Sequence, residues 1–334
     1  MQSIVRVTVH PSQFPQNAQR ALLASLRARQ INHKFLYDGA KHAQKWLALH
    51  EAHSPAPTDP DCAETYEKAF EAAAQMMMAR QVHVIGLGCG GGQKDTRLLE
   101  LLKRGGDPLS YAPCDVSLAM VLEACQTASA VVNAEECFPL LCDLAETEDL
   151  AAVLERENPP GASRLITFFG MLPNFEPQTI LTRLAALLRP NDRLLLSANL
   201  APGPDYAAGL QRILPQYDNA PARDWLMTFL LDLGVERTDG ELRFAIENCP
   251  QKTGLRRVIA EFHFKGWRRI QVANEPFEFR PGDAVRLFFS YRHTTERVRK
   301  LLGGQGIIVL DAWITRSEEE AVFLCRGGGS TEGL

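Results

Sequence analysis

The feature that most constrains this chain is a glycine-rich loop in the stretch QVHVIGLGCGGGQKD, residues 81–95. The apolar run over 82–85 predicts a buried strand, and 96–103 carries leucines at helical spacing. Five of the seven residues over 86–92 are glycine. Strand, glycine turn and helix form the first unit of a nucleotide-binding α/β sheet. Glycine lets a ligand approach the backbone closely, and the helix N-terminus offers free N–H groups.

A second strand is predicted over 109–116, and Asp115 lies at its end. An acid at the tip of the second strand can accept hydrogen bonds from both hydroxyls of a bound ribose. The alternative interpretation is that Asp115 caps the helix that begins near Ser117. The spacing of the loop glycines fits both a dinucleotide site and an S-adenosylmethionine site, so the loop alone does not separate the two.

Composition excludes several classes of protein. The chain has 334 residues, of which 46% are hydrophobic, enough for one large or two modest domains. A net charge of −4 does not favour nucleic acid as a partner. No apolar run reaches the ~18 residues of a transmembrane helix, and the N-terminus lacks a signal-peptide core. The eight cysteines form no C-x-x-C pair, which predicts reduced thiols in a cytoplasmic protein and no metal site.

The chain continues as alternating strands and helices. Further strands are predicted at either 131–132 or 139–142, then at 164–170 and 193–199, with Asp143 closing the third strand. Strands that alternate with helices imply a mostly parallel sheet whose faces are covered. After residue 200 the pattern changes to a helical excursion over 215–234 and then to strands with half-exposed alternation between 242 and 280.

The C-terminal pattern is a helix over 294–302 followed by two strands, 307–314 and 318–325. This ending is the layout of a Class I methyltransferase, whereas dinucleotide dehydrogenases continue with further parallel units. It therefore favours S-adenosylmethionine over NAD. We expect an α/β fold: a Class I Rossmann-like methyltransferase sheet with an inserted α+β substrate domain.

Five segments carry a family resemblance: KFLYDGAKHAQKW from Lys34, GLGCGGGQKD from Gly86, YAPCDVS from Tyr111, FFGMLPNFEP from Phe168 and RPNDRLLLSANL from Arg189. In this order they resemble the histidine-specific methyltransferases, whose best-known member makes the trimethylated histidine of ergothioneine biosynthesis. The resemblance covers most of the chain and implies N-methylation of an amino acid or a related small amine, with S-adenosylmethionine as cofactor.

The resemblance also implies a division into domains. The methyltransferase core would comprise 75–200 and 291–328, and the substrate domain would comprise 1–74 and 201–290, with the ligands between them. The cofactor site is expected to contain Gly86, Gly88, Gly90, Lys94, Asp115, Asp143 and Gly170. Lys94 would lie near the methionine carboxylate; the alternative is that it belongs to a solvated helix start.

For the substrate, the resemblance places Asn174 at the α-amino group and Tyr37 and Tyr217 at the carboxylate. These three residues are the expected catalytic groups, because methyl transfer from a sulfonium needs alignment more than acid chemistry. Phe288 and Ser290 complete the expected substrate site.

Two departures from the family pattern bear on the substrate. The family's imidazole-recognising glutamate falls near Phe288, which cannot accept an imidazole N–H, and a family tyrosine falls near His53. Histidine is therefore not the expected substrate, and an apolar or aromatic group facing Phe288 and Phe289 fits better. The alternative is that both phenylalanines are strand core. The amine proton would pass to water, His53 or His293.

Two other functions stay open from the sequence. An NAD-dependent oxidoreductase would use the same loop, although no proton-relay residue is identified for it. A non-catalytic relative that binds S-adenosylmethionine would act through a protein partner, as the altered substrate positions allow. In the leading interpretation the partner is a small-molecule substrate, with no nucleic acid and no membrane, in the cytoplasm.

Overall fold

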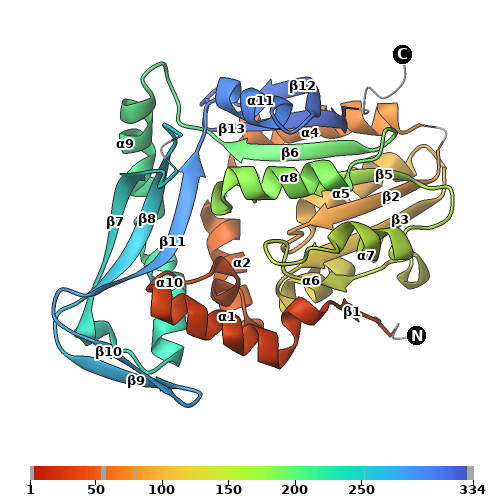
Figure 1. The fold of residues 1–334 in the computed structure, drawn as a ribbon. Helices are drawn as coiled ribbons and strands as arrows, with labels where there is room; N and C mark the ends of the chain where they lie inside the picture. The colour runs from red at the N-terminus through yellow and green to blue at the C-terminus, as the bar shows by residue number, and fades with distance from the viewer. Residues whose placement is uncertain (1–3, 54–57, 79, 252, 329–334) are drawn as a thin grey trace.

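The computed structural model describes residues 4–53, 58–78, 80–251 and 253–328. Its largest element is an eight-stranded sheet in the order β1-β4-β3-β2-β5-β6-β13-β12 (Figure 1). The strands are β1 (Thr8–Val9), β2 (Val82–Leu87), β3 (Leu109–Asp115), β4 (Leu140–Leu141), β5 (Ser163–Phe168), β6 (Arg193–Asn199), β12 (Ile307–Ile314) and β13 (Glu320–Gly327). Of the two alternatives for the third strand, 139–142 therefore contains it. Every residue of β2 is buried, as a strand covered on both faces requires.

Helices connect the parallel strands from β2 to β6. They are α5 (Gln93–Lys103), α6 (Leu118–Ala128), α7 (Leu150–Glu157) and α8 (Pro177–Leu187). β3 lies on one side of β2 and β5 on the other, so the strand order reverses at β2. In such sheets a crevice opens at the carboxyl ends of the strands beside this reversal, where ligands bind.

The C-terminal part completes the sheet. Helix α11 (Thr295–Gly303) leads into β12, and β13 then runs antiparallel between β6 and β12. Because β13 runs against β6, its first residue rather than its last lies at the carboxyl edge of the parallel strands. This strand order, with one antiparallel strand beside β6, confirms the expected Class I Rossmann-like sheet.

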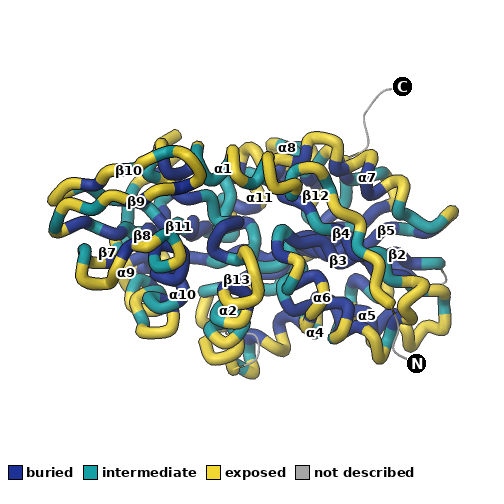
Figure 2. Tube along the Cα trace, turned by 90° about the horizontal axis from the view of Figure 1, so that it is seen from below, coloured by how far each residue is buried: buried dark blue, intermediate teal, exposed yellow. Residues whose placement is uncertain are grey.

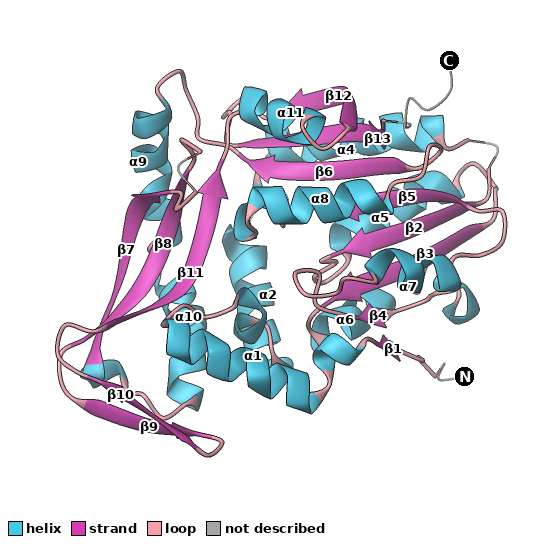
Figure 3. Cartoon of the chain, in the orientation of Figure 1, coloured by secondary structure: helices cyan, strands magenta, loops and turns pink. Residues whose placement is uncertain are grey.

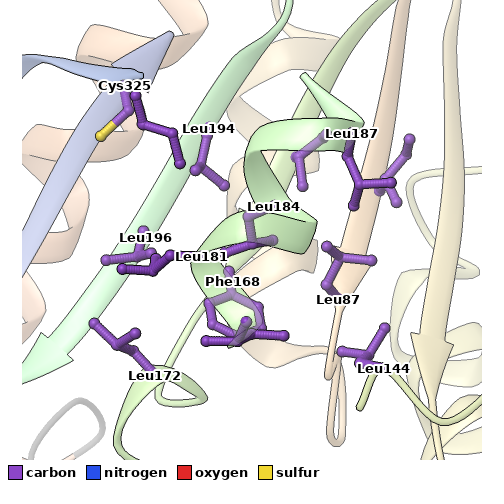
Figure 4. Close-up of a cluster of buried hydrophobic side chains, with 14 of the residues drawn as sticks. Leu87, Leu144, Phe168, Leu172, Leu181, Leu184, Leu187, Leu194, Leu196 and Cys325 are labelled. Atoms are coloured by element: carbon purple, nitrogen blue, oxygen red, sulfur yellow. The ribbon is translucent and has the colours of Figure 1, made fainter. Parts of the chain in front are cut away.

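The sheet is covered on both faces by apolar helix surfaces. Leu87 and Phe168 pack with Leu184 of α8 on one face (Figure 4). Helices α7 and α11 contribute to the same cluster. Val84 points to the opposite face, where it packs with α5 and with α4 (Pro60–Met76). This alternation of side chains along each strand explains why the strands are continuously apolar.

A second, smaller sheet stands beside the first (Figure 3). It contains β7 (Gly240–Asn248), β8 (Arg256–Phe264) and β11 (Ala284–Arg292), and the hairpin β9 (Arg268–Val272) and β10 (Glu275–Phe279) follows β8. Helices α1 (Pro15–Ala28), α2 (Gly39–His53), α9 (Tyr206–Tyr217) and α10 (Ala220–Asp232) accompany it. Leu26 and Phe35 share a buried cluster with Trp225 and Phe262. The N-terminal helices and the segment after residue 200 therefore have a common core. Figure 2 colours the buried residues of the chain dark blue.

The helical excursion expected over 215–234 is helical in the structure but is divided and begins earlier, at Tyr206. The chain forms two helices, and the break between them lies at Asp218 and Asn219. The Asn219 side chain accepts a hydrogen bond from the backbone N–H of Ala222, 2.9 Å away, and so begins α10 as a new helix. Among the described ranges, none of the helices combines the length and apolar character needed to cross a bilayer.

Candidate active site

A cleft of about 1550 Å³ lies between the carboxyl edge of the large sheet and the smaller sheet with its helices. Its walls include the glycine loop, the ends of β3 and β5, and parts of α2, α10 and β11. All but one of the cofactor-binding and substrate-binding residues expected from the sequence line this cleft: Tyr37, Gly88, Gly90, Lys94, Asp115, Asp143, Gly170, Asn174, Tyr217, Phe288 and Ser290. The fold thus gathers residues from the whole length of the chain into one cavity.

The glycine loop adopts backbone conformations that favour glycine. Gly88 has φ of 69° and Gly92 has φ of 77°. A Cβ atom on Gly92 would lie 2.8 Å from the Cα of Ala124 in α6, so a side chain there cannot fit. Helix α5 begins at Gln93, immediately after the loop, and its first N–H groups have no partner within the helix. The loop is therefore suited to hold a polar or anionic group against bare backbone.

Asp115 ends β3 and is bonded to the loop. Its carboxylate accepts hydrogen bonds from the backbone N–H groups of Gly90 at 3.1 Å and Ser117 at 3.0 Å. Burial raises the pKa of Asp115, and the N–H groups that donate to it oppose the increase. The bond to Ser117 agrees with the helix-start interpretation, while the position of Asp115 on the cleft wall leaves it able to contact a ligand.

Gly86 is the expected site residue that does not line the cleft. It lies inside β2, and a Cβ atom there would overlap the carboxylate of Asp95. Asp95 is buried in α5 and accepts hydrogen bonds from Tyr111 and Thr167, both at 2.7 Å. Burial raises the pKa of Asp95 to about 6. Gly86 therefore makes room for a buried acid beneath the loop.

Lys94 lies in the first turn of α5 and points toward α4. Its Nζ donates a hydrogen bond to the Tyr66 hydroxyl at 2.8 Å and lies 3.8 Å from the Glu320 carboxylate. All three side chains line the cleft beside the glycine loop. Lys94 is thus part of a polar cluster, rather than of a simple solvated helix start.

Asp143 directly follows the short strand β4 and forms an ion pair with Lys34. The Lys34 Nζ lies 2.9 Å from the Asp143 carboxylate, and both side chains are buried. Asp143 also accepts a hydrogen bond from the backbone N–H of Ala145 at 2.9 Å.

Gly170 lies just beyond β5 with φ of 68°, and its N–H donates to the Ser197 hydroxyl at 2.8 Å.

The tyrosines expected at the substrate carboxylate lie on separate elements. Tyr217, the last residue of α9, shares a 2.8 Å hydrogen bond with Ser290 and accepts one from Arg292 at 3.0 Å. Tyr37 packs against Trp225, with ring centroids 5.5 Å apart. Burial, and then the nearby Asp115 carboxylate, raise the pKa of Tyr37, so its hydroxyl stays protonated near neutral pH.

Phe288 lies on the cleft wall within a group of aromatic rings. Its ring is stacked on His33 at a centroid distance of 5.1 Å and an angle of 13°, and it lies about 6 Å from Tyr217 (6.1 Å) and Trp225 (6.0 Å). His33 Nε2 accepts the backbone N–H of Phe289 at 3.1 Å. Burial lowers the pKa of His33 to about 3, so this ring is neutral. The rings around Phe288 are therefore neutral, while the Arg292 guanidinium lies beside Tyr217 at the edge of this group.

The two histidines considered as proton acceptors differ in position. His53 ends α2 and lines the cleft. His293 is fully buried and is not part of the cleft wall, and burial lowers its pKa to about 3. The expectation that His293 lies in the cleft is wrong, because its backbone bonds to Asn199 and Ala201 hold it inside the fold.

Several cleft residues were missed from the sequence. They include His33, Tyr66, Glu176, Arg292 and Glu320. Each has a polar or ionisable side chain whose interaction partners lie far away in the chain, so no local sequence pattern indicates its role. Glu176 follows the Asn174-Phe175 pair and is bonded to Tyr291 at 2.9 Å, so its proximity to that motif was the one available signal.

The arrangement can hold a nucleoside-bearing cofactor at the glycine loop and a second ligand beside it. Solved structures with similar architecture include the magnesium protoporphyrin IX methyltransferase of Synechocystis PCC 6803 with bound SAH (15% identity, TM-score 0.43, covering 86% of this chain and 95% of that one). Another is the 1,6-didemethyltoxoflavin-N1-methyltransferase of Burkholderia thailandensis (12% identity, TM-score 0.42, covering 85% and 86%). The comparison with curated proteins gives no match.

Residues 16–231 match the family described as histidine-specific methyltransferase, SAM-dependent. The match identifies S-adenosylmethionine as the cofactor, so the alternative of an NAD-dependent oxidoreductase is not retained. It also identifies an enzyme, so the alternative of a non-catalytic relative is not retained either. The glycine-rich loop and the acid at the tip of β3 fit this cofactor. The chain belongs to the histidine-specific, S-adenosylmethionine-dependent methyltransferase family.

Proposed function

We propose that the enzyme transfers a methyl group from S-adenosylmethionine to the amino nitrogen of an amino acid or a related small amine other than histidine. The observation that carries this proposal is the cleft itself. Asn174, Tyr37 and Tyr217 line the same cavity as Asp115 and the glycine loop.

The proposed cofactor contacts run along the carboxyl edge of the large sheet. Asp115 binds the ribose, Lys94 lies at the methionine end, and Gly88, Gly90, Asp143 and Gly170 line the rest of the site. When bound, S-adenosylmethionine supplies an electrophilic methyl group on a good leaving group. The protein therefore has to align the amine nitrogen with the methyl group for direct transfer.

The proposed substrate contacts use neutral hydroxyls and one cation. Tyr37 keeps its proton, so its hydroxyl can donate to a carboxylate. Arg292 donates to the oxygen of Tyr217, which adds positive charge beside that hydroxyl and leaves its proton for a ligand or for Ser290. Asn174 orients the amine. The proton that the amine loses passes to water or to His53 at the end of α2.

The aromatic wall supports a substrate other than histidine. Phe288 offers no acceptor for an imidazole N–H, and the neutral His33 is stacked on it. Offset stacking favours an aromatic or apolar side chain at this wall. We also assign roles to the two parts of the chain. Residues 75–200 and 291–328 hold the cofactor, and residues 201–290 with the N-terminal residues hold the substrate. Because β1 is a strand of the large sheet and α4 packs on it, we place the residues of both elements with the cofactor half.

The test is a methylation screen with a deuterated methyl donor, read by fragmentation mass spectrometry. We expect methyl groups on the α-nitrogen of aromatic amino acids, with higher kcat/KM than for histidine. Asn174→Ala should lower kcat/KM by roughly 10- to 100-fold, the value of a hydrogen bond to a charged or reacting group. Preference for histidine, or unchanged turnover in Asn174→Ala, would contradict the proposal.

A matched pair of substrates separates the roles of the tyrosines. Tyr217→Phe should weaken the reaction of an amino acid but not that of the amine with the same side chain and no carboxylate. Equal losses for both would show that Tyr217 does not hold the carboxylate.

A further inference from the structure

Glu320 is a buried acid on the cleft wall, and the direction of β13 places it there. As the first residue of an antiparallel strand, it pairs with Asn199, the last residue of β6. Both residues line the cleft at the carboxyl edge of the large sheet. A parallel strand in this position would instead have placed its first residue at the opposite edge.

The carboxylate of Glu320 receives weak compensation for its burial. Its side chain is 9% exposed, and the Tyr66 hydroxyl and the Cys62 thiol donate to it, the thiol at 3.5 Å. A thiol is a weak donor, and a carboxylate can accept about four hydrogen bonds. Among the residues that the structure describes, the cation that pairs with it is Lys94, at 3.8 Å. Burying a charge is costly unless it is fully paired, so this acid has capacity for a cationic partner.

Lys94 presents the opposite charge next to it. Its Nζ has three donors, one of which the Tyr66 hydroxyl accepts. Tyr66 thus joins the two charges, because it accepts from Lys94 and donates to Glu320. His50 also lines this part of the cleft, and burial lowers its pKa to about 4, so it is neutral. A cation and an anion therefore stand side by side at the glycine loop.

We propose that Glu320 binds the α-ammonium group of S-adenosylmethionine, beside Lys94, which binds the carboxylate of the same methionine end. The two opposite charges of the protein match the two charges of the ligand's zwitterion. The nearest rival is a positioning role, in which Glu320 acts through Tyr66 to hold Lys94 in place and never contacts the ligand.

Calorimetry with two ligands distinguishes these roles. The first ligand is S-adenosylhomocysteine, and the second is its analogue that lacks the α-amino group but keeps the carboxylate. We expect Glu320→Gln to bind S-adenosylhomocysteine roughly 10- to 100-fold more weakly than the wild type, as for loss of a charge-assisted hydrogen bond. The analogue should bind both proteins equally, or the variant more tightly. Equal losses for both ligands would establish the positioning role and overturn the proposal.

Two further measurements guard against a misfolded variant. Glu318→Gln removes the same charge two residues away, where the carboxylate accepts a hydrogen bond from the backbone N–H of Gly203 at 2.9 Å outside the cleft wall, and it should bind S-adenosylhomocysteine like the wild type. The wild type alone also tests the proposal, because it should prefer S-adenosylhomocysteine to the analogue by roughly 10- to 100-fold. Equal affinity of the wild type for the two ligands would overturn the proposal without any variant.

Discussion

The buried ion pair between Lys34 and Asp143 joins the N-terminal segment to the cofactor-binding sheet. Their charged atoms are 2.9 Å apart, and the side chains are only 6% and 5% exposed. Removing one partner leaves an uncompensated buried charge, so Lys34→Met should lower the free energy of unfolding by about 3–5 kcal/mol. Asp143 would keep its bond from Ala145, which favours the lower end of that range.

Urea unfolding followed by tryptophan fluorescence measures this loss. The double variant Lys34→Met with Asp143→Asn should lose less than the sum of the single variants, because it leaves neither charge alone. The control is Lys41→Met, whose partner Asp232 is 2.6 Å away, but with side chains 57% and 43% exposed. Exposed pairs contribute about 0–1 kcal/mol, so this variant should change little. Equal small losses for Lys34→Met and Lys41→Met would refute the reasoning.

Two further predictions concern the glycine loop and the acid beneath it. Because burial raises the pKa of Asp95 from 3.8 to about 6, the folded state binds its proton more tightly than the unfolded state. The contribution of Asp95 to the free energy of unfolding should therefore fall by about 3 kcal/mol as pH rises from ~4 to ~6, and Asp95→Asn should remove this contribution. A pH-independent difference in urea unfolding between the two proteins would contradict the prediction. Gly92→Ala should lower both stability and S-adenosylhomocysteine affinity, because its Cβ would meet Ala124. Gly106→Ala has nearly the same φ, 78°, but open space around it, so equal losses in both variants would exclude the steric cause.

Local patterns allowed the cofactor side of the site to be predicted from the sequence. The loop glycines and Asp115 are adjacent to the apolar strands that position them, so short windows contained the needed information. The large sheet could be predicted for the same reason, because its buried parallel strands are continuous apolar runs in the sequence. The two C-terminal strands were informative as well, since an ending of this kind is incompatible with further parallel units.

The substrate side depends on contacts between distant segments, which no window contains. The stack of His33 on Phe288 joins the N-terminal segment to β11. The contact of Glu320 with Lys94 depends on β13 being antiparallel. Gly86 looked like a ligand contact in the sequence, but its neighbour is the buried Asp95 from the following helix. The contacts of these residues depend on the direction of their side chains and strands in the folded chain. Residue type alone predicts neither direction.

The account depends most on S-adenosylmethionine occupying the glycine loop with its ribose on Asp115. Calorimetric titration of S-adenosylhomocysteine, with NAD as a parallel ligand, tests this directly in the wild type and in Asp115→Ala. The account predicts micromolar binding of S-adenosylhomocysteine to the wild type, its loss in the variant, and no binding of NAD. Binding of NAD, or equal binding of S-adenosylhomocysteine by both proteins, would contradict the account.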